Sequence, residues 1–408
     1  MPDFYGLSPQ RSTSLRAKPL SGIRVLDLTR LLPGPVATLH LADMGADVVK
    51  IEDTEAGDYA RVMGRVRETG NPGAPPMSDF FRLVNRNKRA MRLDLKQPQG
   101  REVFLRLAKD ADVVVEGFRP GVMAKLGVGY DALAAVNPRL VYCSITGYGQ
   151  DGPYADRAGH DINYIGYAGV GDQIGTADAP VVPNFQIADL LGGALTPVMG
   201  ILAALIDARS SGRGRHVDVA MTDAVLAHAI LPLLGFLEHG KTPARGSGML
   251  DGGLPCYNVY RTRDGLWMAV GALERKFWET LCDILGCPEL KGKHIVYGEE
   301  ARPVKERLAA AFASRTQHEW SEVFARADCC VSPILTVEEA LENEQLRARG
   351  MAIVKEGVTQ LALPVKFSEF EFAIVRPAPG SGEHTDEVLR EAGFRDAEIA
   401  ALRRNAVI

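Results

Sequence analysis

The sequence predicts an α/β protein of two domains, a large one built on an open parallel sheet and a smaller α+β one. Strand-like and helix-like segments alternate along the first 239 residues, which is the pattern of βαβ units and hence of parallel strands. After residue 240 the alternation gives way to a hairpin signal followed by helices. A length of 408 residues also exceeds what a single core usually serves.

The large domain begins with a βαβ unit in residues 22–52. Segments 22–28 and 46–52 are apolar and strand-like, 36–43 fits a helix, and Pro33-Gly34-Pro35 breaks the chain between the first strand and the helix. Further elements are predicted in the order helix 101–109, strand 111–116, helix 122–126, strand 140–145, helix 190–209, strand 215–220 and helix 224–239. No G-x-G-x-x-G spacing occurs, so residues 1–239 predict a Rossmann-like sheet without a nicotinamide dinucleotide site.

The smaller α+β domain is expected at residues 240–330. A Gly/Pro-rich linker leads into two strand-like segments, 258–262 and 266–270, which flank the turn signal Arg263-Asp264-Gly265. Three helical segments follow, at 276–285, 301–314 and 318–326. We expect residues 331–408, with a strand-like segment at 364–372, to return to the large domain and complete it.

Composition excludes several classes of function. The formal net charge is −4, so the chain has no bulk electrostatic attraction to nucleic acid or to an anionic membrane. No apolar run in the sequence reaches the length of a membrane span. The six cysteines form no C-x-x-C pair and no zinc-type spacing, which predicts no metal site, reduced thiols and a cytoplasmic location.

Three acid/base candidates stand beside glycines: His160, Asp189 and Glu274. His160 follows a predicted strand and a turn-rich loop, at the edge where open α/β sheets bind ligands, and a histidine there can act as a general base near neutral pH. Asp189 opens a predicted helix, in which Gly192 and Gly193 are expected to leave room for a ligand. Taken singly, His160 and Asp189 also fit plain helix starts and Glu274 a surface charge, so both interpretations stay open.

Basic side chains gather after a polar stretch, residues 54–77, that is expected to be a long loop. The set is Arg82, Arg86, Lys88, Arg89, Arg92 and Lys96, with Arg119 and Lys125 further on. Such a run fits either a solvated face or a docking surface for the phosphates of a nucleotide-like ligand. The absence of G-x-x-x-x-G-K-[ST] and of G-x-S-x-G argues against ATP chemistry and against a hydrolase.

Motifs along most of the chain, from about Pro19 to about residue 370, resemble the family III CoA-transferase superfamily. The matching segments are 20–25, 42–51, 85–89, 116–121, 146–153 and 211–214. Within that superfamily, segments 159–164, 249–253 and 271–274 are similar to the alpha-methylacyl-CoA racemases. One position departs from the pattern: the resemblance implies a CoA-binding arginine where this chain has Asp53. The phosphate contact is expected either to be lost or to be replaced from the following loop, with Arg61 as the candidate.

The resemblance implies a ring-shaped subunit whose two domains are joined by two linkers, and two rings interlocked as a homodimer. It implies an active site between the large domain of one subunit and the small domain of the other. Coenzyme A would enter only as part of the thioester substrate, with no permanently bound cofactor and no metal. The implied CoA contacts are Arg86, Leu93, Lys96, Gly117, Phe118, Arg119, Lys125, Gly159, Asp161 and Tyr164.

Three activities stay open under this resemblance. In an acyl-CoA racemase or epimerase, His160 and Asp189 would be the two acid/base groups acting on C2 of a 2-methylacyl-CoA, with Glu274 beside them. In a CoA-transferase, Asp189 would instead be the nucleophile that takes the acyl group. A catalytically silent acyl-CoA-binding protein would need the basic surface but neither group. We expect the racemase.

Overall fold

The computed structural model describes residues 17–68, 76–355 and 357–408. The chain divides into two compact units. Unit 1 contains the described residues up to 160, together with 187–224 and 348–408, and unit 2 contains 161–186 and 225–347. The sequence-based division at 240 and 330 assigns 161–186, 225–239 and 331–347 to the large domain, whereas in the structure they group with unit 2.

Unit 1 is built on a six-stranded sheet in which every neighbouring pair is parallel. The order across the sheet is β5 (Arg89–Arg92), β2 (Asp47–Glu52), β1 (Arg24–Asp27), β6 (Val113–Glu116), β7 (Val141–Thr146) and β8 (His216–Ala220). In chain order this is the 3-2-1-4-5-6 arrangement of doubly wound sheets, so the predicted Rossmann-like sheet is confirmed. The order reverses between β1 and β6, which makes the carboxyl ends of these two strands the expected ligand site.

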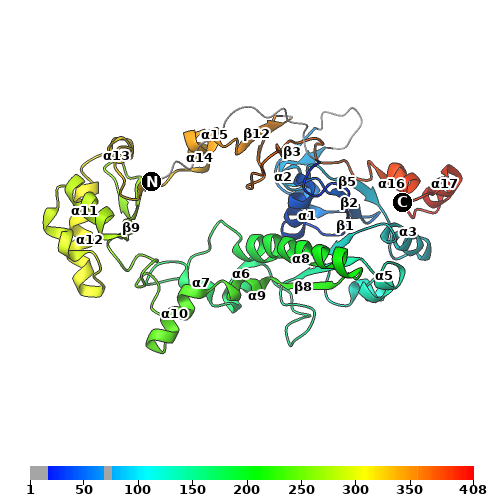
Figure 1. The fold of residues 1–408 in the computed structure, drawn as a ribbon, viewed down its shortest axis with the longest axis horizontal. Coiled ribbons are helices and arrows are strands. Elements are labelled where there is room, and N and C mark those ends of the chain that lie inside the picture. The colour runs from blue at the N-terminus through cyan, green and yellow to red at the C-terminus, as the bar shows by residue number, and fades with distance from the viewer. Residues whose placement is uncertain (1–16, 69–75, 356) are drawn as a thin grey trace. The chain divides into compact units, whose positions relative to one another are not determined.

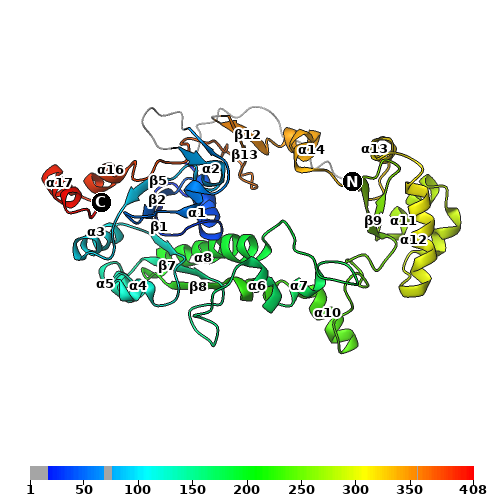
Figure 2. The ribbon, with the colours of Figure 1, turned by 180° about the vertical axis from the view of Figure 1, so that it is seen from behind.

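Alternate side chains of the strands enter two separate cores, one on each face of the sheet. Residues such as Leu26 and Val114 pack under α3 (Pro98–Ala108), α4 (Val122–Lys125), α5 (Tyr130–Val136), α16 (Thr385–Glu391) and α17 (Asp396–Arg404). Val25 and Val115 pack under α1 (Pro33–Asp43) and α8 (Thr196–Ser211). Figure 1 and Figure 2 show these helices on the two sides of the sheet.

Shorter elements connect this framework. Unit 1 also contains η1 (Tyr59–Val62), β3 (Val66–Arg67), β4 (Met77–Ser78), α2 (Asp79–Asn85) and the π-helix η2 (Ala188–Leu195). The expected long loop 54–77 therefore carries secondary structure on both sides of residues 69–75, which lie outside the description. The helix α9 (Met221–Ala227) follows β8 and reaches into unit 2.

The apolar helix formed by η2 and α8 corrects one sequence expectation. Residues Ala188–Ser211 are long and apolar enough to span a membrane by length and composition. One side of this helix, including Ile201, Leu205 and Ala208, is buried against the sheet. Its apolar character is accounted for in part by this packing, which is how a helix covering an α/β sheet is stabilised.

The predicted strand at 364–372 is wrong. Instead β12 (Ala352–Lys355) and β13 (Val358–Leu361) form an antiparallel pair, and Phe367 and Phe370 are joined only by an isolated bridge. Glu369 between them has φ +59°, a turn conformation that a strand cannot contain. The alternating aromatic residues Phe370 and Phe372 pack on the core under α1 and α8, so the period-2 pattern marks burial rather than pairing.

Unit 2 confirms the predicted hairpin. Strands β9 (Tyr257–Arg261) and β10 (Trp267–Gly271) pair antiparallel, and β11 (Val331–Pro333) adds to β10. Three helices cover them around a core with Trp278, Phe312 and Trp320: α11 (Arg275–Ile284), α12 (Gly298–Phe312) and α13 (Gln317–Phe324). The other helices are α6 (Asp161–Tyr167), α7 (Val170–Gln173), α10 (Ile230–His239), η3 (Pro288–Lys293), α14 (Val337–Glu342) and α15 (Glu344–Ala348, which ends in unit 1).

Candidate active site

The loops that follow β1 and β6 meet at the reversal point of the sheet. Arg30, from the first loop, has its guanidinium carbon 5.5 Å from the ring centre of Phe118, from the second. The same guanidinium lies 5.8 Å from the ring centre of Tyr59. Gly117 and Arg119 lie beside Phe118 just beyond β6. A cation framed by aromatic faces therefore stands at the edge where doubly wound sheets bind anionic ligands.

Buried charges fix the loop that carries Arg30. Lys50 Nζ donates to the Thr29 carbonyl at 2.8 Å and forms an ion pair of 2.7 Å with Asp58 Oδ2. Asp58 Oδ1 in turn accepts the Leu31 N–H at 3.0 Å. Leu31 has φ +66°, which is unfavourable for a leucine and persists only where neighbours enforce it. The Lys50–Asp58 pair thus holds the backbone on both sides of Arg30.

Arg30 also accounts for the departure at Asp53. Arg30 Nη2 lies 2.5 Å from Asp53 Oδ2, while Asp53 Oδ1 accepts the N–H groups of Glu55 and Gly57. Partial burial raises the pKa of Asp53, but the backbone amides of Gly57 and Glu55 and the guanidinium of Arg30 outweigh it, so the net shift is downward. A guanidinium from the β1 loop therefore lies against Asp53, the position at which the family resemblance implies an arginine. Arg30 is not among the residues predicted from the sequence, although it lies in the loop just after β1.

The expected substitute, Arg61, is engaged elsewhere. Its guanidinium forms hydrogen bonds of 2.8 and 2.5 Å with the two oxygens of Glu52 and stacks on the Phe81 ring at 3.9 Å. It also donates to the Pro379 carbonyl at 3.0 Å. These contacts make Arg61 a structural link between β2, α2 and the C-terminal segment.

Most basic side chains of the stretch 82–96 are buried: Arg82, Arg86, Lys88 and Arg89. For these residues the predicted docking surface for phosphates is wrong. Lys88 is fully buried, and its ammonium group contacts Asp27, Thr38, Asn85 and the Pro35 carbonyl at 2.8–3.1 Å. Burial lowers the pKa of Lys88 to about 8 against the opposing attraction of Asp27.

Other members of the stretch are likewise occupied. Arg86 is buried and ion-paired with Asp43 at 2.7 Å, and Arg89 is buried against Asp47, Glu387 and Glu391. Leu93 is buried in the core under α3. Lys96 is exposed, with Glu55 3.3 Å away, and Lys125 is exposed at the end of α4. Of the implied CoA contacts, Lys96, Gly117, Arg119 and Lys125 are exposed and Phe118 is half-buried.

The three acid/base candidates lie at the starts of helices. His160 is exposed and directly precedes α6, where Gly159, Asp161 and the buried Tyr164 also lie. The loop that leads to it leaves β7 at Thr146 and is tied to α9 by two hydrogen bonds from Thr222 to the Gly147 carbonyl, at 3.0 and 2.8 Å. Asp189 is half-buried in the first turn of η2. Glu274 is exposed and directly precedes α11, in unit 2.

The glycines after Asp189 serve packing rather than ligand access, which corrects the sequence expectation. A Cβ on Gly192 would lie 2.9 Å from the Met221 Cα, and one on Gly193 would collide with Pro33. Pro33 opens α1 just after the loop of Arg30. The turn that carries Asp189 is therefore pressed against the segment that follows the Arg30 loop. It is also a π-helix, a local geometry that is frequent at functional sites.

Among the described residues, no group of three or more His, Cys, Asp or Glu side chains is arranged to hold a metal ion. All six cysteines are free thiols, and five of them are buried. The imidazole, carboxylate, arginine and lysine side chains at this edge can transfer protons, attack as a carboxylate nucleophile and bind anions.

Known proteins with similar sequences include both isomerases and transferases. A family model described as CoA-transferase family III matches residues 20–385. The chain is 37% identical to the alpha-methylacyl-CoA racemase of Homo sapiens, over 95% of this chain and 97% of that protein. It is 35% identical to the succinate–glutarate CoA-transferase of Agrobacterium fabrum, over 96% and 98%. A solved CAIB/BAIF family protein from Brucella suis superposes with a TM-score of 0.81 at 32% identity, over 92% and 100%.

Proposed function

The chain belongs to CoA-transferase family III, and on that premise we propose that it is an acyl-CoA racemase that interconverts the C2 epimers of 2-methylacyl-CoA thioesters. The observation that carries the proposal is the presence of His160, beyond the carboxyl end of β7. The chain thus has an imidazole as well as the carboxylate of Asp189 in η2. Moving a proton between the two faces of one carbon calls for two acid/base groups, whereas acyl transfer calls for the carboxylate alone.

In the proposed reaction the thioester carbonyl acidifies the C2–H bond. The neutral imidazole of His160 takes the C2 proton from one epimer, and the electron pair moves into an enolate. The protonated carboxyl of Asp189 then delivers a proton to the opposite face of C2. The two groups exchange roles in the reverse direction, so no net proton is consumed. Glu274 is proposed to lie beside them.

Coenzyme A supplies the anionic part of the substrate, and Arg30 is the group best arranged to meet a phosphate. Its guanidinium lies at the reversal point of the sheet on a loop held by Lys50 and Asp58. Exposed Arg119 and Lys125 extend the positive edge. Because arginine forks bind phosphate through paired hydrogen bonds, we propose that Arg30 exchanges Asp53 for a phosphate when the substrate binds.

A CoA-transferase is the second candidate, favoured by the similarity to the succinate–glutarate enzyme. In that reaction the Asp189 carboxylate attacks the thioester carbonyl and the CoA thiolate leaves, which gives a mixed anhydride. The CoA thiolate then attacks the aspartyl carbonyl to give an enzyme-bound thioester and releases the first acid. The acceptor carboxylate completes the exchange.

One mass-spectrometric experiment separates the two activities. The enzyme is incubated with a 2-methylacyl-CoA in heavy water, and hydroxylamine is added to a parallel sample. We expect deuterium at C2 and no hydroxamate on Asp189. A hydroxamate at Asp189 without C2 exchange would replace the racemase by the transferase.

The matched variant is His160→Ala. We expect it to lower C2 exchange by about 10²–10⁴-fold, as loss of a general base typically does, with unchanged circular dichroism. Asp189→Asn would stop both activities and therefore serves only as the inactive control. Full exchange activity in His160→Ala would refute the role of the imidazole.

We also propose that the protein is an interlocked homodimer of ring-shaped subunits in the cytoplasm. In support, large apolar side chains remain uncovered on the outer side of η2 and α8 and along α10; they include Leu195, Met199, Ile206, Ile230, Leu233 and Leu237. Exposed apolar surface of this kind usually marks an interface. Analytical ultracentrifugation at nanomolar concentration is expected to give a dimer, and a natively folded monomer would contradict the proposal.

A further inference from the structure

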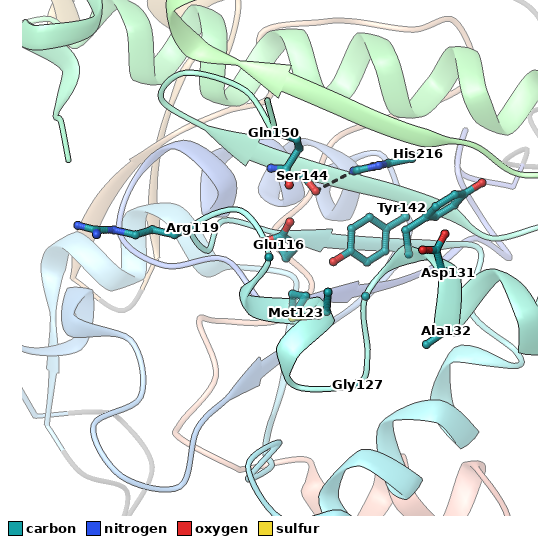
Figure 3. A pocket seen from close by; sticks show the side chains of 14 residues that line it. Glu116, Arg119, Met123, Gly127, Asp131, Ala132, Tyr142, Ser144, Gln150 and His216 are labelled. Atoms are coloured by element: carbon teal, nitrogen blue, oxygen red, sulfur yellow. Dashed lines mark hydrogen bonds between the residues drawn. The ribbon is translucent and has the colours of Figure 1, made fainter. Parts of the chain in front are cut away.

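A hollow lies in unit 1, on the face of the sheet that α4 and α5 cover. Its volume is about 400 Å³, within the range of small-molecule sites. The sheet contributes Glu116, Tyr142, Ser144 and His216 to its lining, and Gln150 comes from the loop after β7 (Figure 3). Tyr130 of α5 lines it as well. The lining includes Arg119, one of the implied CoA contacts, but neither His160 nor Asp189, so the hollow is separate from the proposed acid/base pair.

The polar side of the hollow is a short hydrogen-bonded chain. Glu116 is only 4% exposed, and its Oε2 accepts the Phe118 N–H at 2.8 Å. Its carboxyl group is also hydrogen-bonded to the Ser144 hydroxyl. Ser144 Oγ lies 2.9 Å from His216 Nε2, and the imidazole is exposed. Among the described residues no cation contributes to the pKa of Glu116, and burial raises that pKa to about 7.

Gln150 supplies a donor for which the described part of the chain offers no acceptor. Its backbone N–H donates to Asp218 at 3.1 Å, which anchors the residue beside β8. Its side-chain Nε2 is buried and finds no hydrogen-bond partner among the described residues. Figure 3 shows Gln150 and Glu116 near Ser144 at the same end of the hollow. Buried amide donors are nearly always paired, so an unpaired one that lines a cavity points to a bound acceptor.

The remaining walls are flat and aromatic. The rings of Tyr130 and His216 stack with centres 5.3 Å apart and an angle of 24° between their planes. Tyr142 meets His216 edge-on at 5.3 Å. Met123 and Ala124 of α4 line the hollow as well. Such walls favour a planar ligand, because aromatic faces stack on flat rings.

We propose that this hollow binds a neutral, planar nitrogen heterocycle of nucleobase size, held by the Gln150 amide and the Glu116 carboxyl. Gln150 Nε2 donates to a ring nitrogen or a carbonyl oxygen, and Glu116 accepts the adjacent N–H. A purine or pyrimidine edge presents such a neighbouring donor and acceptor. At the end of the hollow beside Glu116 an anion is disfavoured, because the charge of Asp218 already opposes the ionised form of Glu116.

The planar heterocycle can come from two sources. One is the adenine of the CoA substrate, an assignment that rests on the proposed function. The other is a free nucleobase or nucleoside. The probe is 9-methyladenine, titrated into the full-length protein and followed by calorimetry and ligand-detected NMR. We expect saturable binding. We also expect 9-methylpurine, which lacks the exocyclic N–H donor, to bind at least tenfold more weakly. This comparison within the wild-type protein does not depend on the folding of any variant.

The variant Gln150→Leu removes the donor with little change of shape, and it should weaken 9-methyladenine at least tenfold. Gln345→Leu, on the exposed side of α15, is the matched control and should leave binding unchanged. Competition by coenzyme A would identify the substrate's own adenine as the source, and absence of competition would identify a separate ligand. No saturable binding up to about 10 mM, or equal affinities for the two purines, would overturn the proposal whatever the C2 exchange assay gives.

Discussion

Unit 1 contains two polar interiors that differ in how completely they are neutralised. The first, which we call the switch-point cluster, consists of Asp27, Lys50, Asp58 and Lys88 around the β1 loop. All four are essentially buried, and each carboxylate lies against an ammonium group at 2.7–3.1 Å. The second is the hollow beside β6, β7 and β8, where Glu116 has hydrogen bonds but no cation, and Gln150 Nε2 has no partner among the described residues.

This difference distinguishes side chains that only stabilise the fold from side chains that can bind a ligand. Buried charges that satisfy one another fix a backbone conformation and leave nothing to offer a ligand. The switch-point cluster accordingly holds Leu31 at positive φ and so presents Arg30. Polar groups that remain partly unsatisfied are costly for folding alone, so they persist where a ligand completes them. The following predictions test whether the two interiors differ in this way.

The largest expected effect is on the switch-point cluster. Lys50→Met should lower the free energy of unfolding by about 3–5 kcal/mol, because Asp58 is left as a buried charge without its partner. Urea denaturation measures the loss. Lys96→Met is the matched control: its pair with Glu55 is exposed, so the change should stay within about 1 kcal/mol. Equal losses in the two variants would remove the distinction between buried and surface pairs.

The next effect concerns Glu116 and depends on pH. Burial raises its pKa from 4.5 to about 7, so between these values the unfolded chain releases the proton while the folded protein keeps it. Stability contributed by the protonated carboxyl is complete below about pH 4.5 and is lost as pH rises towards 7, by about 3 kcal/mol in full.

Glu116→Gln keeps the shape and hydrogen bonds but cannot ionise. Relative to this variant, the wild-type protein should lose stability as pH rises from about 4.5 to about 7.5, as measured by denaturant midpoints at each pH. Parallel pH profiles for the two proteins would mean that Glu116 is neutralised as completely as the switch-point carboxylates.

The smallest effect is on substrate affinity. Arg30→Ala should raise the KM for acyl-CoA about tenfold, which corresponds to about 1.4 kcal/mol, with little change in kcat, because it removes a phosphate contact made in both ground and transition states. Stability should hardly change, because Arg30 is half-exposed. The comparison substrate is acyl-pantetheine, which lacks the nucleotide phosphates. If Arg30→Ala impaired both substrates equally, Arg30 would belong to the scaffold.

Much of the fold follows from the sequence alone. The βαβ alternation in residues 22–220 predicts parallel strands because the apolar runs and the turn residues between them are local signals. Arg263-Asp264-Gly265 predicts its hairpin for the same reason, since glycine supplies the positive φ, +85° at Gly265, that the turn uses. Positions that follow strands, such as Gly117, Phe118 and His160, are thereby assigned to the ligand edge before any tertiary contact is known.

Tertiary structure alone decided which charges are scaffold and which face a ligand. In the sequence Lys88 and Arg89 resemble part of a basic surface. In the structure they lie at the start of β5, against carboxylates from β1, β2 and α16. Arg30 meets Asp53 across 23 residues, and Glu116, Ser144 and His216 converge from three strands whose order the sequence does not specify. Burial and charge pairing depend on which distant segments become neighbours, and that is set by strand order and register rather than by local propensity.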